Sequence, residues 1–236
     1  MIDTAYLIRT AEQEGISLTG ETARLLDRYA EELCRVNEYT NLTAITDPEG
    51  IANKHFLDSL LLESVYPLPQ GASLADVGTG AGFPGLPLKL HRPDIRLCLM
   101  DSLGKRITFL TDLCRLLEVE SDAIHIRAEE AGKDARFREQ FDVVTARAVA
   151  ALPTLCELCL PLAKVGGVFV AMKGGDPEEE LAAAKKGIAT LGGKVERVEN
   201  RTLPDGSRRT FVVIRKVSQT PTKYPRSFSK IAKAPL

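Results

Sequence analysis

Apolar residues recur at helical spacing in the first quarter of the chain. One face of a predicted helix is formed by Leu25, Leu26, Tyr29, Leu33 and Val36. A polar joint over residues 37–43 separates this helix from a second one. The second helix begins near Asp47, which can cap its N-terminus, and Pro48, which suits a first helical turn. We therefore expect a small N-terminal helical region over residues 1–66.

The pattern changes after residues 67–71, where two prolines and a glycine interrupt regular structure. Short apolar runs then alternate with helical stretches. The predicted strands are 74–77, 97–100, 124–127, 141–146 and 168–172. One predicted helix begins near residue 86, and three others span 105–117, 152–162 and 178–191. This alternation predicts an α/β fold with a doubly wound, mostly parallel sheet over residues 67–236. Strand patterns at 194–201 and 208–215 flank a turn, so the sheet should end in an antiparallel hairpin.

Length and composition favour one core and argue against a membrane protein. The 236 residues, 44% of them hydrophobic, suffice for one sizeable α/β core with an appendage. No apolar run approaches the roughly 18 to 20 residues that cross a bilayer. The segment Met1–Ala5 lacks the basic start and apolar stretch of a signal peptide. We expect a cytoplasmic protein, and favour a monomer.

The five cysteines form no disulfide framework. Cys156 and Cys159 make a C-x-x-C motif, which could bind zinc or support redox chemistry. The pair lies in an apolar helical segment with no second such motif and no nearby histidine. We therefore favour buried thiols that act as small hydrophobes, and expect no metal site.

Charge is distributed unevenly along the chain. Residues 201–236 hold nine Lys or Arg and one acid, whereas the first 200 residues hold 22 basic and 31 acidic groups. A basic stretch on an acidic body is typical of proteins that contact a polyanion, although it is also typical of a solvated tail. Nucleic acid is therefore a candidate partner.

A glycine-rich loop follows the first predicted strand, with glycines at 78, 80, 82 and 85. Closely spaced glycines let a backbone turn tightly and approach a ligand, and open α/β sheets bind ligands where such strands end. The spacing of the glycines at 80, 82 and 85 fits the Gly-x-Gly-x-x-Gly fingerprint of dinucleotide-binding proteins. Proline has no backbone N–H, however, so Pro84 and Pro87 remove amide donors that a pyrophosphate would need. The Asp-x-Gly-x-Gly-x-Gly form of residues 76–82 is instead usual for S-adenosylmethionine in class I, Rossmann-like methyltransferases.

Two further positions suit the same cofactor. Asp101 ends the next predicted strand, where a carboxylate can accept hydrogen bonds from both ribose hydroxyls or merely cap a helix. Ala128 and Glu129 follow the third strand, where the adenine edge usually lies in this fold.

Residues 77–88 and 101–106, with Asn41–Ile45, His55–Leu60, Thr145–Ala148, Met172–Gly174 and the C-terminal pieces Lys223–Arg226 and Lys233–Leu236, resemble the RsmG family (glucose-inhibited division protein B). These bacterial enzymes methylate N7 of a guanine in 16S ribosomal RNA. The resemblance spans about residues 37–236. It implies S-adenosylmethionine as cofactor and a contact set of Gly78, Phe83, Asp101, Ser102, Leu103, Ala128, Glu129 and Arg147, and the glycine loop adds Gly80.

The implied chemistry requires no general base. Guanine N7 carries an in-plane lone pair and no proton at neutral pH, so the barrier falls chiefly when N7, methyl and sulfur are held in line. We therefore assign no catalytic residue. His55 and Asp58 share one helix face and could position the guanine or the RNA backbone, or tie the N-terminal helices to the core. Arg147 and Lys173 follow two strands and could contact cofactor or phosphate, or form strand-end salt bridges.

Phosphate contacts that position RNA without reading its sequence are expected from basic side chains. The candidates are Lys105, Arg106, Arg208, Arg209, Lys223, Arg226, Lys230 and Lys233. The expected partner is 16S ribosomal RNA or the small ribosomal subunit. Three other interpretations stay open: a methyltransferase for another RNA site, a small molecule or a protein; an NAD-dependent redox protein; and an RNA-binding module with an inactive cofactor pocket.

Overall fold

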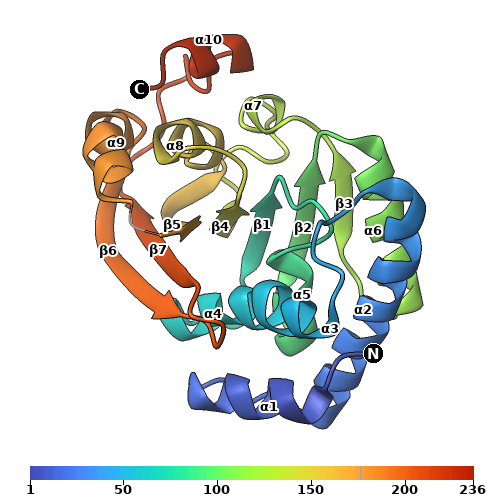
Figure 1. The fold of residues 1–236 in the computed structure, drawn as a ribbon. Coiled ribbons are helices and arrows are strands. Elements are labelled where there is room, and N and C mark those ends of the chain that lie inside the picture. Colours follow the sequence, from blue (N-terminus) through green and yellow to red (C-terminus); the bar gives the residue numbers. More distant parts are fainter. Residues whose placement is uncertain (176) are drawn as a thin grey trace.

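The computed structural model describes residues 1–175 and 177–236 (Figure 1). Seven strands form the sheet: β1 (Ser73–Val77), β2 (Arg96–Asp101), β3 (Asp122–His125), β4 (Phe141–Arg147), β5 (Ala163–Gly174), β6 (Gly193–Thr202) and β7 (Arg208–Lys216). The N-terminal helices are α1 (Thr4–Gln13), α2 (Gly20–Thr40), α3 (Pro48–Gly50), the π-helix η1 (Ile51–Leu57) and α4 (Asp58–Val65). The remaining helices are α5 (Gly85–His91), α6 (Gly104–Leu116), α7 (Ala128–Ala131), α8 (Leu152–Cys159), α9 (Glu178–Thr190) and α10 (Phe228–Lys233).

The sheet has the order β3-β2-β1-β4-β5-β7-β6. Neighbouring strands from β3 to β5 are parallel, whereas β7 runs antiparallel to both β5 and β6. The predicted parallel sheet with a late antiparallel hairpin is therefore confirmed. The chain order reverses between β1 and β4, and a crevice opens at the carboxyl ends of strands at such a reversal. The glycine loop follows β1 at this point.

Helices cover both faces of the sheet, which explains why its central strands are almost wholly apolar. One face packs against α2, α4, α5 and α6, and the other against α8 and α9 (Figure 1). Helices α1, α2, η1 and α4 contribute to the same core as the first face, so the N-terminal helices and the sheet share one hydrophobic interior. No helix in residues 1–175 or 177–236 combines the length and the apolar character required to cross a membrane.

Several boundaries differ from the sequence-based prediction. Helix α2 continues through residues 37–40 of the predicted polar joint. Its last turn is exposed to solvent, so the polar side chains there keep their hydration in the helix. It ends at Asn41, which adopts the left-handed conformation. Strand β3 begins and ends two residues earlier than expected, and β5 extends beyond both predicted ends. The predicted cap is confirmed, since the Asp47 carboxylate accepts a hydrogen bond from the backbone of Gly50 at 2.6 Å.

The π-helix η1 lies in the middle of the second predicted helix. A π-helix has a wider turn than an α-helix and is frequent at functional sites. Here it presents the side chains of Lys54 and His55, together with Asp58 just beyond it, toward the crevice. The Lys54 carbonyl accepts a hydrogen bond from Arg147 at 3.0 Å, so η1 is tied to the end of β4.

The basic C-terminal stretch is not a free tail. Residues 217–236, which we call the C-terminal strap, pack back onto the α8 and α9 side of the sheet, with α10 beside α8 and α9 in Figure 1. The guanidinium of Arg138 donates to the carbonyls of Thr220 and Tyr224 at 2.7 and 2.8 Å. Lys216 is fully buried and donates to Thr220 Oγ1 at 2.8 Å, so the strap is anchored where it leaves β7.

The C-x-x-C cysteines lie on α8 and are fully buried. Burial raises the pKa of both thiols, so they stay protonated at neutral pH. The interpretation of Cys156 and Cys159 as small buried hydrophobes is confirmed.

Candidate active site

The glycine loop turns sharply because three of its glycines adopt positive φ. The φ angles of Gly78, Gly80 and Gly82 are 68°, 61° and 105°. The backbone amides of Gly78 and Thr79 donate to the carbonyl of Met100 at 2.8 and 3.1 Å, which fixes the loop to the end of β2. From the other side, the buried Tyr29 hydroxyl of α2 donates to the carbonyl of Ala81.

Asp76 holds the two ends of the same loop together. Its Oδ2 accepts hydrogen bonds from Thr79 Oγ1 at 2.7 Å and from the Gly85 amide, which opens α5, at 2.8 Å. Its Oδ1 is buried and has no partner in the described chain. Burial raises the pKa of this carboxyl to about 6, although the two hydrogen bonds oppose the shift. Asp76 therefore positions the loop from behind and does not line the cavity described next.

A cavity of about 330 Å³ lies at the carboxyl ends of β1, β2 and β3, and we call it the β1–β3 cavity. Its lining includes five of the predicted cofactor residues, namely Gly78, Asp101, Ser102, Ala128 and Glu129. Its apolar lining includes Ile126, Val149, Leu158 and Phe228, which the sequence did not single out. Gly80, Phe83, Leu103 and Arg147 do not line this cavity.

The Asp101 carboxylate is held by three donors within the protein. Its Oδ2 accepts from the Gly80 amide at 3.0 Å and from Arg106 Nη1 at 3.1 Å, and its Oδ1 accepts from the Leu103 amide at 2.9 Å. Oδ2 uses both of its lone pairs for these donors, whereas Oδ1 keeps one that is open to a ribose hydroxyl. Gly80 and Leu103 thus support Asp101 through their amides. Arg106 is engaged with Asp101 through Nη1, and its predicted contact with phosphate stays a prediction.

A second cavity, of about 380 Å³, lies beside the first, and we call it the β4–β7 cavity. It is lined by Ile45, Lys54, His55, Asp58, Arg147, Ala148, Met172, Lys173, Gly174 and Arg209. The structure therefore brings together five predicted residues that are scattered along the sequence: His55, Asp58, Arg147, Lys173 and Arg209. Arg147, which the resemblance placed among the cofactor contacts, lies in this cavity and not in the β1–β3 cavity.

Asp58 bridges two arginines in the β4–β7 cavity. Its Oδ2 is 2.9 Å from Arg147 Nη1 and its Oδ1 is 3.0 Å from Arg209 Nε, while the Asp58 side chain is only 2% exposed. Lys54 pairs with Asp205 at 3.0 Å and Lys173 with Glu180 at 2.9 Å. With these partners counted, four Lys and Arg stand against three acids, so the cavity keeps a net positive charge of one, which favours anions.

Phe83 connects the glycine loop with the β4–β7 cavity. Its ring is stacked between Tyr29, with centroids 5.2 Å apart, and His55, with centroids 4.3 Å apart. The Arg147 guanidinium carbon lies 5.1 Å from the centroid of the same ring. Phe83 is 5% exposed and orients His55 and Arg147, so its side chain serves the second cavity. A cofactor contact of Phe83 through its backbone stays a prediction.

His55 has the position required for both of the roles predicted for it. It lines the β4–β7 cavity, and it also joins the N-terminal helices to the core. Its Nε2 lies 2.9 Å from Thr43 Oγ1, and its ring stacks on Phe83. Burial lowers the pKa of His55 to about 3, and the nearby Arg147 guanidinium acts in the same direction. His55 is therefore neutral at pH 7.

The low pKa of His55 predicts an acid-sensitive fold. Between pH 6.5 and about 3 the unfolded chain binds a proton at His55 that the folded chain does not, so stability is lost as pH falls. Asp76 has the opposite effect between pH 3.8 and about 6. Its carboxyl stays protonated in the folded chain and is ionised in the unfolded chain, so this contribution to stability is lost as pH rises. Replacing His55 with Gln should therefore flatten the pH dependence of the unfolding free energy by up to about 1.4 kcal/mol per pH unit.

Urea unfolding of wild type and His55→Gln at pH 5, 6 and 7 measures this difference. Asp76 is present in both proteins, so its contribution cancels in the comparison. The variant also loses the stacking of His55 on Phe83. This loss lowers its stability by the same amount at every pH, so it does not affect the slope of the unfolding free energy against pH. Parallel stability profiles for the two proteins would show that His55 is protonated in the folded state.

Residues 148–150 separate the two cavities. Ala148 lines the β4–β7 cavity, and Val149 lines the β1–β3 cavity. Ala148 has a φ of 55°, a left-handed conformation that costs a non-glycine residue about 1 to 2 kcal/mol. Val149 packs directly over Gly78, because a Cβ added to Gly78 would lie only 2.6 Å from Val149 Cγ2. The two cavities therefore meet above the first glycine of the loop.

The predicted phosphate contacts fall into two groups. Arg226 forms a bidentate ion pair with the fully buried Glu157, and Lys105 donates to the carbonyl of Thr40 at 2.8 Å at the end of α2. These two side chains hold the fold together, so for them the structure supports an internal role. Arg208, Lys230 and Lys233 are exposed and make no side-chain hydrogen bond or ion pair within the described chain. They remain candidates for RNA phosphate, with Lys223, which lies over the Tyr224 ring.

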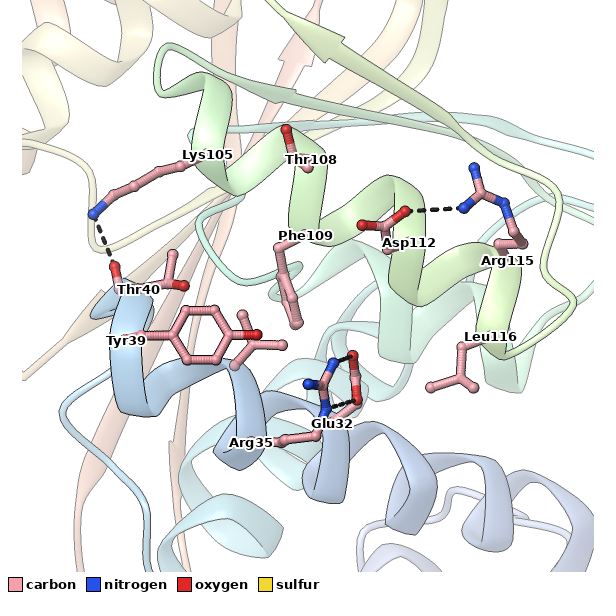
Figure 2. A pocket seen from close by; sticks show the side chains of 11 residues that line it. Glu32, Arg35, Tyr39, Thr40, Lys105, Thr108, Phe109, Asp112, Arg115 and Leu116 are labelled. Atoms are coloured by element: carbon pink, nitrogen blue, oxygen red, sulfur yellow. Dashed lines mark hydrogen bonds and ion pairs between the residues drawn. The ribbon is translucent and has the colours of Figure 1, made fainter.

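A more voluminous cavity than either of these, about 750 Å³, lies elsewhere, between α2 and α6 (Figure 2). Its floor includes Val36 and Phe109, and Tyr39 is exposed at its edge. Its charged groups are mostly paired, as Figure 2 shows for Arg35 with Glu32 and Arg115 with Asp112. Apart from Lys105 no predicted site residue lines it. Cavity volume alone therefore does not locate the active site.

The strand order, with a glycine loop and a cavity at the point of reversal, defines the class I methyltransferase fold. A solved S-adenosylmethionine-dependent methyltransferase from Aquifex aeolicus shares it, with a TM-score of 0.51 and 18% identity over 74% of this chain and 97% of that chain. The family model for rRNA small subunit methyltransferase G matches residues 22–210. The chain belongs to this family, and the resemblance inferred from its motifs is confirmed.

Curated relatives match the whole chain. The Ribosomal RNA small subunit methyltransferase G of Geobacillus sp. (strain WCH70) is 47% identical over 237 residues, covering 100% of both chains. The protein of the same description from Pelotomaculum thermopropionicum is 48% identical over 228 residues, covering 96% of this chain and 95% of its own. This chain is therefore a methyltransferase.

Proposed function

We propose that this protein transfers a methyl group from S-adenosylmethionine to N7 of a guanine in 16S ribosomal RNA, releasing S-adenosylhomocysteine. The observation that carries the proposal is the pair of neighbouring cavities that meet at residues 148–150 above Gly78. One is partly apolar and contains an acidic strand end, and the other is cationic. Such a pair suits a cofactor and a nucleic-acid acceptor whose reacting atoms must lie close together.

The β1–β3 cavity fits the adenosine part of the cofactor. Asp101 and Ser102 line it at the end of β2, where hydroxyl groups of a ribose can be bound. Ile126, Ala128 and Leu158 offer apolar surface to a flat ring. The missing Cβ of Gly78 leaves room for Val149, which lines the same cavity.

The β4–β7 cavity fits a guanine and its phosphates. Arg and Lys side chains recognise guanine by donating to O6 and bind phosphate as cations. A donor on O6 alone leaves the N7 lone pair free for methyl transfer. Arg147 suits this role because Asp58 and the Lys54 carbonyl fix its guanidinium while Phe83 supports its face.

The chain's contribution to the reaction is orientation. When bound, S-adenosylmethionine supplies an electrophilic methyl group, and guanine N7 carries no proton that must be removed. His55 is neutral and partnered by Thr43, so it serves as a wall of the acceptor cavity and accepts no proton in the reaction. Alignment by a rigid site can contribute on the order of 7 to 11 kcal/mol at best.

Transfer of labelled methyl from S-adenosylmethionine to small ribosomal subunits from cells that lack the protein tests this function. Free 16S RNA and a small-molecule fraction from the same cells serve as competing acceptors. Label at a single N7-methylguanosine is expected. Label in another RNA, at another guanine position or in small molecules would overturn the proposed acceptor and leave the family assignment in place.

The exposed cations of the C-terminal third should contribute to RNA affinity. We expect the double variant Arg208→Ala with Lys230→Ala to weaken RNA binding and to reduce the slope of log affinity against log salt by up to about 1.4, roughly 0.7 for each phosphate that is no longer neutralised. Filter binding between 50 and 300 mM salt measures the slope, and cofactor affinity should stay constant.

A matched double variant, Arg35→Ala with Arg115→Ala, removes the same charge from the cavity between α2 and α6. Both of its arginines are paired with acids, so the salt slope should hardly change. Equal slopes for all three proteins would exclude Arg208 and Lys230 from the RNA interface.

A further inference from the structure

Phe228 of α10 is an exposed aromatic ring at the edge of the β1–β3 cavity. It is 42% exposed and lines the cavity with Ala128 and Leu158. The residue that fixes helix α10 to the core is the fully buried Ile231, and not Phe228. Attachment of the strap to the core therefore does not require an aromatic residue at position 228.

The strap holds this ring in place. Two residues before it, Arg226 pairs with the fully buried Glu157 of α8, with Nε 2.8 Å from Oε1 and Nη2 2.5 Å from Oε2. The preceding Pro225 packs so closely on Gly132 that a Cβ there would lie 2.8 Å from Pro225 Cγ. The position of Phe228 at the cavity is therefore built in before any ligand binds.

The ring is also oriented by the opposite wall of the cavity. The Arg127 guanidinium carbon lies 5.2 Å from the Phe228 ring centroid, and Arg127 Nε donates to Glu129 Oε1 at 2.6 Å. Both Arg127 and Glu129 line the same cavity. One end of the cavity thus offers an aromatic ring and aliphatic groups, with a carboxylate beside them. This combination suits a flat heteroaromatic ring with amino-group donors.

We propose that Phe228 stacks on the adenine ring of the cofactor and so makes the C-terminal strap part of the cofactor site. The inference rests on the proposed use of S-adenosylmethionine. It assigns the strap a role in cofactor binding, whereas the basic charge of the region had suggested RNA alone. The adenine enters between the strap and the end of β3, beside Ala128 and Glu129.

Binding to the Phe228→Ala variant tests the assignment, with two probes measured by calorimetry: S-adenosylhomocysteine and 5′-methylthioadenosine, which keeps the adenosine and lacks the amino acid. Stacking of a base on an aromatic side chain predicts about a tenfold loss of affinity. The loss should be equal for both probes, because it arises at the adenine. In turnover, KM for S-adenosylmethionine should rise by a similar factor with kcat nearly unchanged. Val217→Ala, an exposed apolar residue of the same strap that does not line the cavity, is the matched control.

A tryptophan at position 228 supplies an independent readout. The chain contains no tryptophan, so Phe228→Trp carries the single indole of the protein. Its emission should change on addition of S-adenosylhomocysteine, while a Tyr39→Trp control at the α2–α6 cavity should stay constant. Unchanged affinity of Phe228→Ala for both probes, or a loss confined to RNA affinity, would overturn the stacking assignment while leaving the proposed function. Failure of the wild-type protein to bind S-adenosylhomocysteine would overturn the proposed cofactor itself.

Discussion

Replacing Asp58 with Asn is expected to lower methyl transfer to the ribosomal acceptor by about 100-fold while changing S-adenosylhomocysteine affinity less than about threefold. Each carboxylate oxygen of Asp58 holds a different arginine, and the side chain is 2% exposed. An asparagine keeps one acceptor oxygen and turns an amide donor toward the second guanidinium. Because a buried charge left without its partner is costly, either Arg147 or Arg209 should leave its position.

The effect of Asp58→Asn should appear in the kinetic parameters measured with RNA as the varied substrate. Asp58 lies in the β4–β7 cavity and does not line the β1–β3 cavity, so KM for RNA should rise and kcat fall with the cofactor parameters nearly constant. Stability should also decrease, by about 2 to 4 kcal/mol, somewhat less than the 3 to 5 typical of a fully buried pair, because the arginine side chains are 14% and 20% exposed. Assays are therefore run below the variant's unfolding midpoint, and cofactor binding confirms that the variant is folded.

Asp205→Asn is the matched control, because Asp205 forms an exposed ion pair with Lys54 at the rim of the same cavity. Exposed pairs are worth little, so transfer should change less than about threefold. Full activity of Asp58→Asn in a folded protein would show that the arginine pair is not needed to position the acceptor. A loss of cofactor affinity equal to the loss of transfer would place Asp58 in the cofactor site instead.

The sheet could be predicted from the sequence because its signals are local. Apolar runs such as 74–77 and 97–100 match strands that are buried on both faces, and the late alternation matched the antiparallel hairpin. The π-helix η1 could not be predicted, because one widened turn hardly changes the spacing of apolar residues around Leu57. The strap was also missed. Its positive charge indicated a tail in solvent, whereas its docking depends on contacts such as Arg138 with Thr220, which are 82 residues apart.

The candidate site was predicted as a set of residues, but its division into two cavities was not. Motif positions placed Asp101 at the end of β2 and Glu129 just after β3, and both line the same cavity because parallel strands end at one edge of the sheet. The grouping of Asp58 with Arg209, 151 residues apart, depends on β7 entering the sheet beside β5. The same topology carries Phe228 to the cavity from the far end of the chain. Charge pattern alone could not distinguish Arg226, which binds Glu157, from the exposed Lys230.

Gly78→Ala is expected to lower S-adenosylhomocysteine affinity by at least about 30-fold. Gly78 has a φ of +68°, which costs an L-residue about 1 to 2 kcal/mol, and an added Cβ would lie 2.6 Å from Val149 Cγ2. The methyl group must therefore move either the glycine loop or residues 148–150. Both line the β1–β3 cavity, so the binding space should shrink at the point where it meets the acceptor cavity. Calorimetric titration measures the change.

Gly80→Ala separates the two causes. Gly80 has a similar φ of +61°, but a Cβ there would have no atom within 4 Å. It therefore carries the backbone strain without the collision, and its affinity loss should stay below about 30-fold, the factor that about 2 kcal/mol of strain corresponds to. Truncating Val149 to Ala in the Gly78→Ala background should recover part of the binding, since it removes the colliding methyl groups. Equal losses for the two glycine variants, with no recovery from Val149→Ala, would show that the conformation of the loop, and not its contact with residues 148–150, governs cofactor binding.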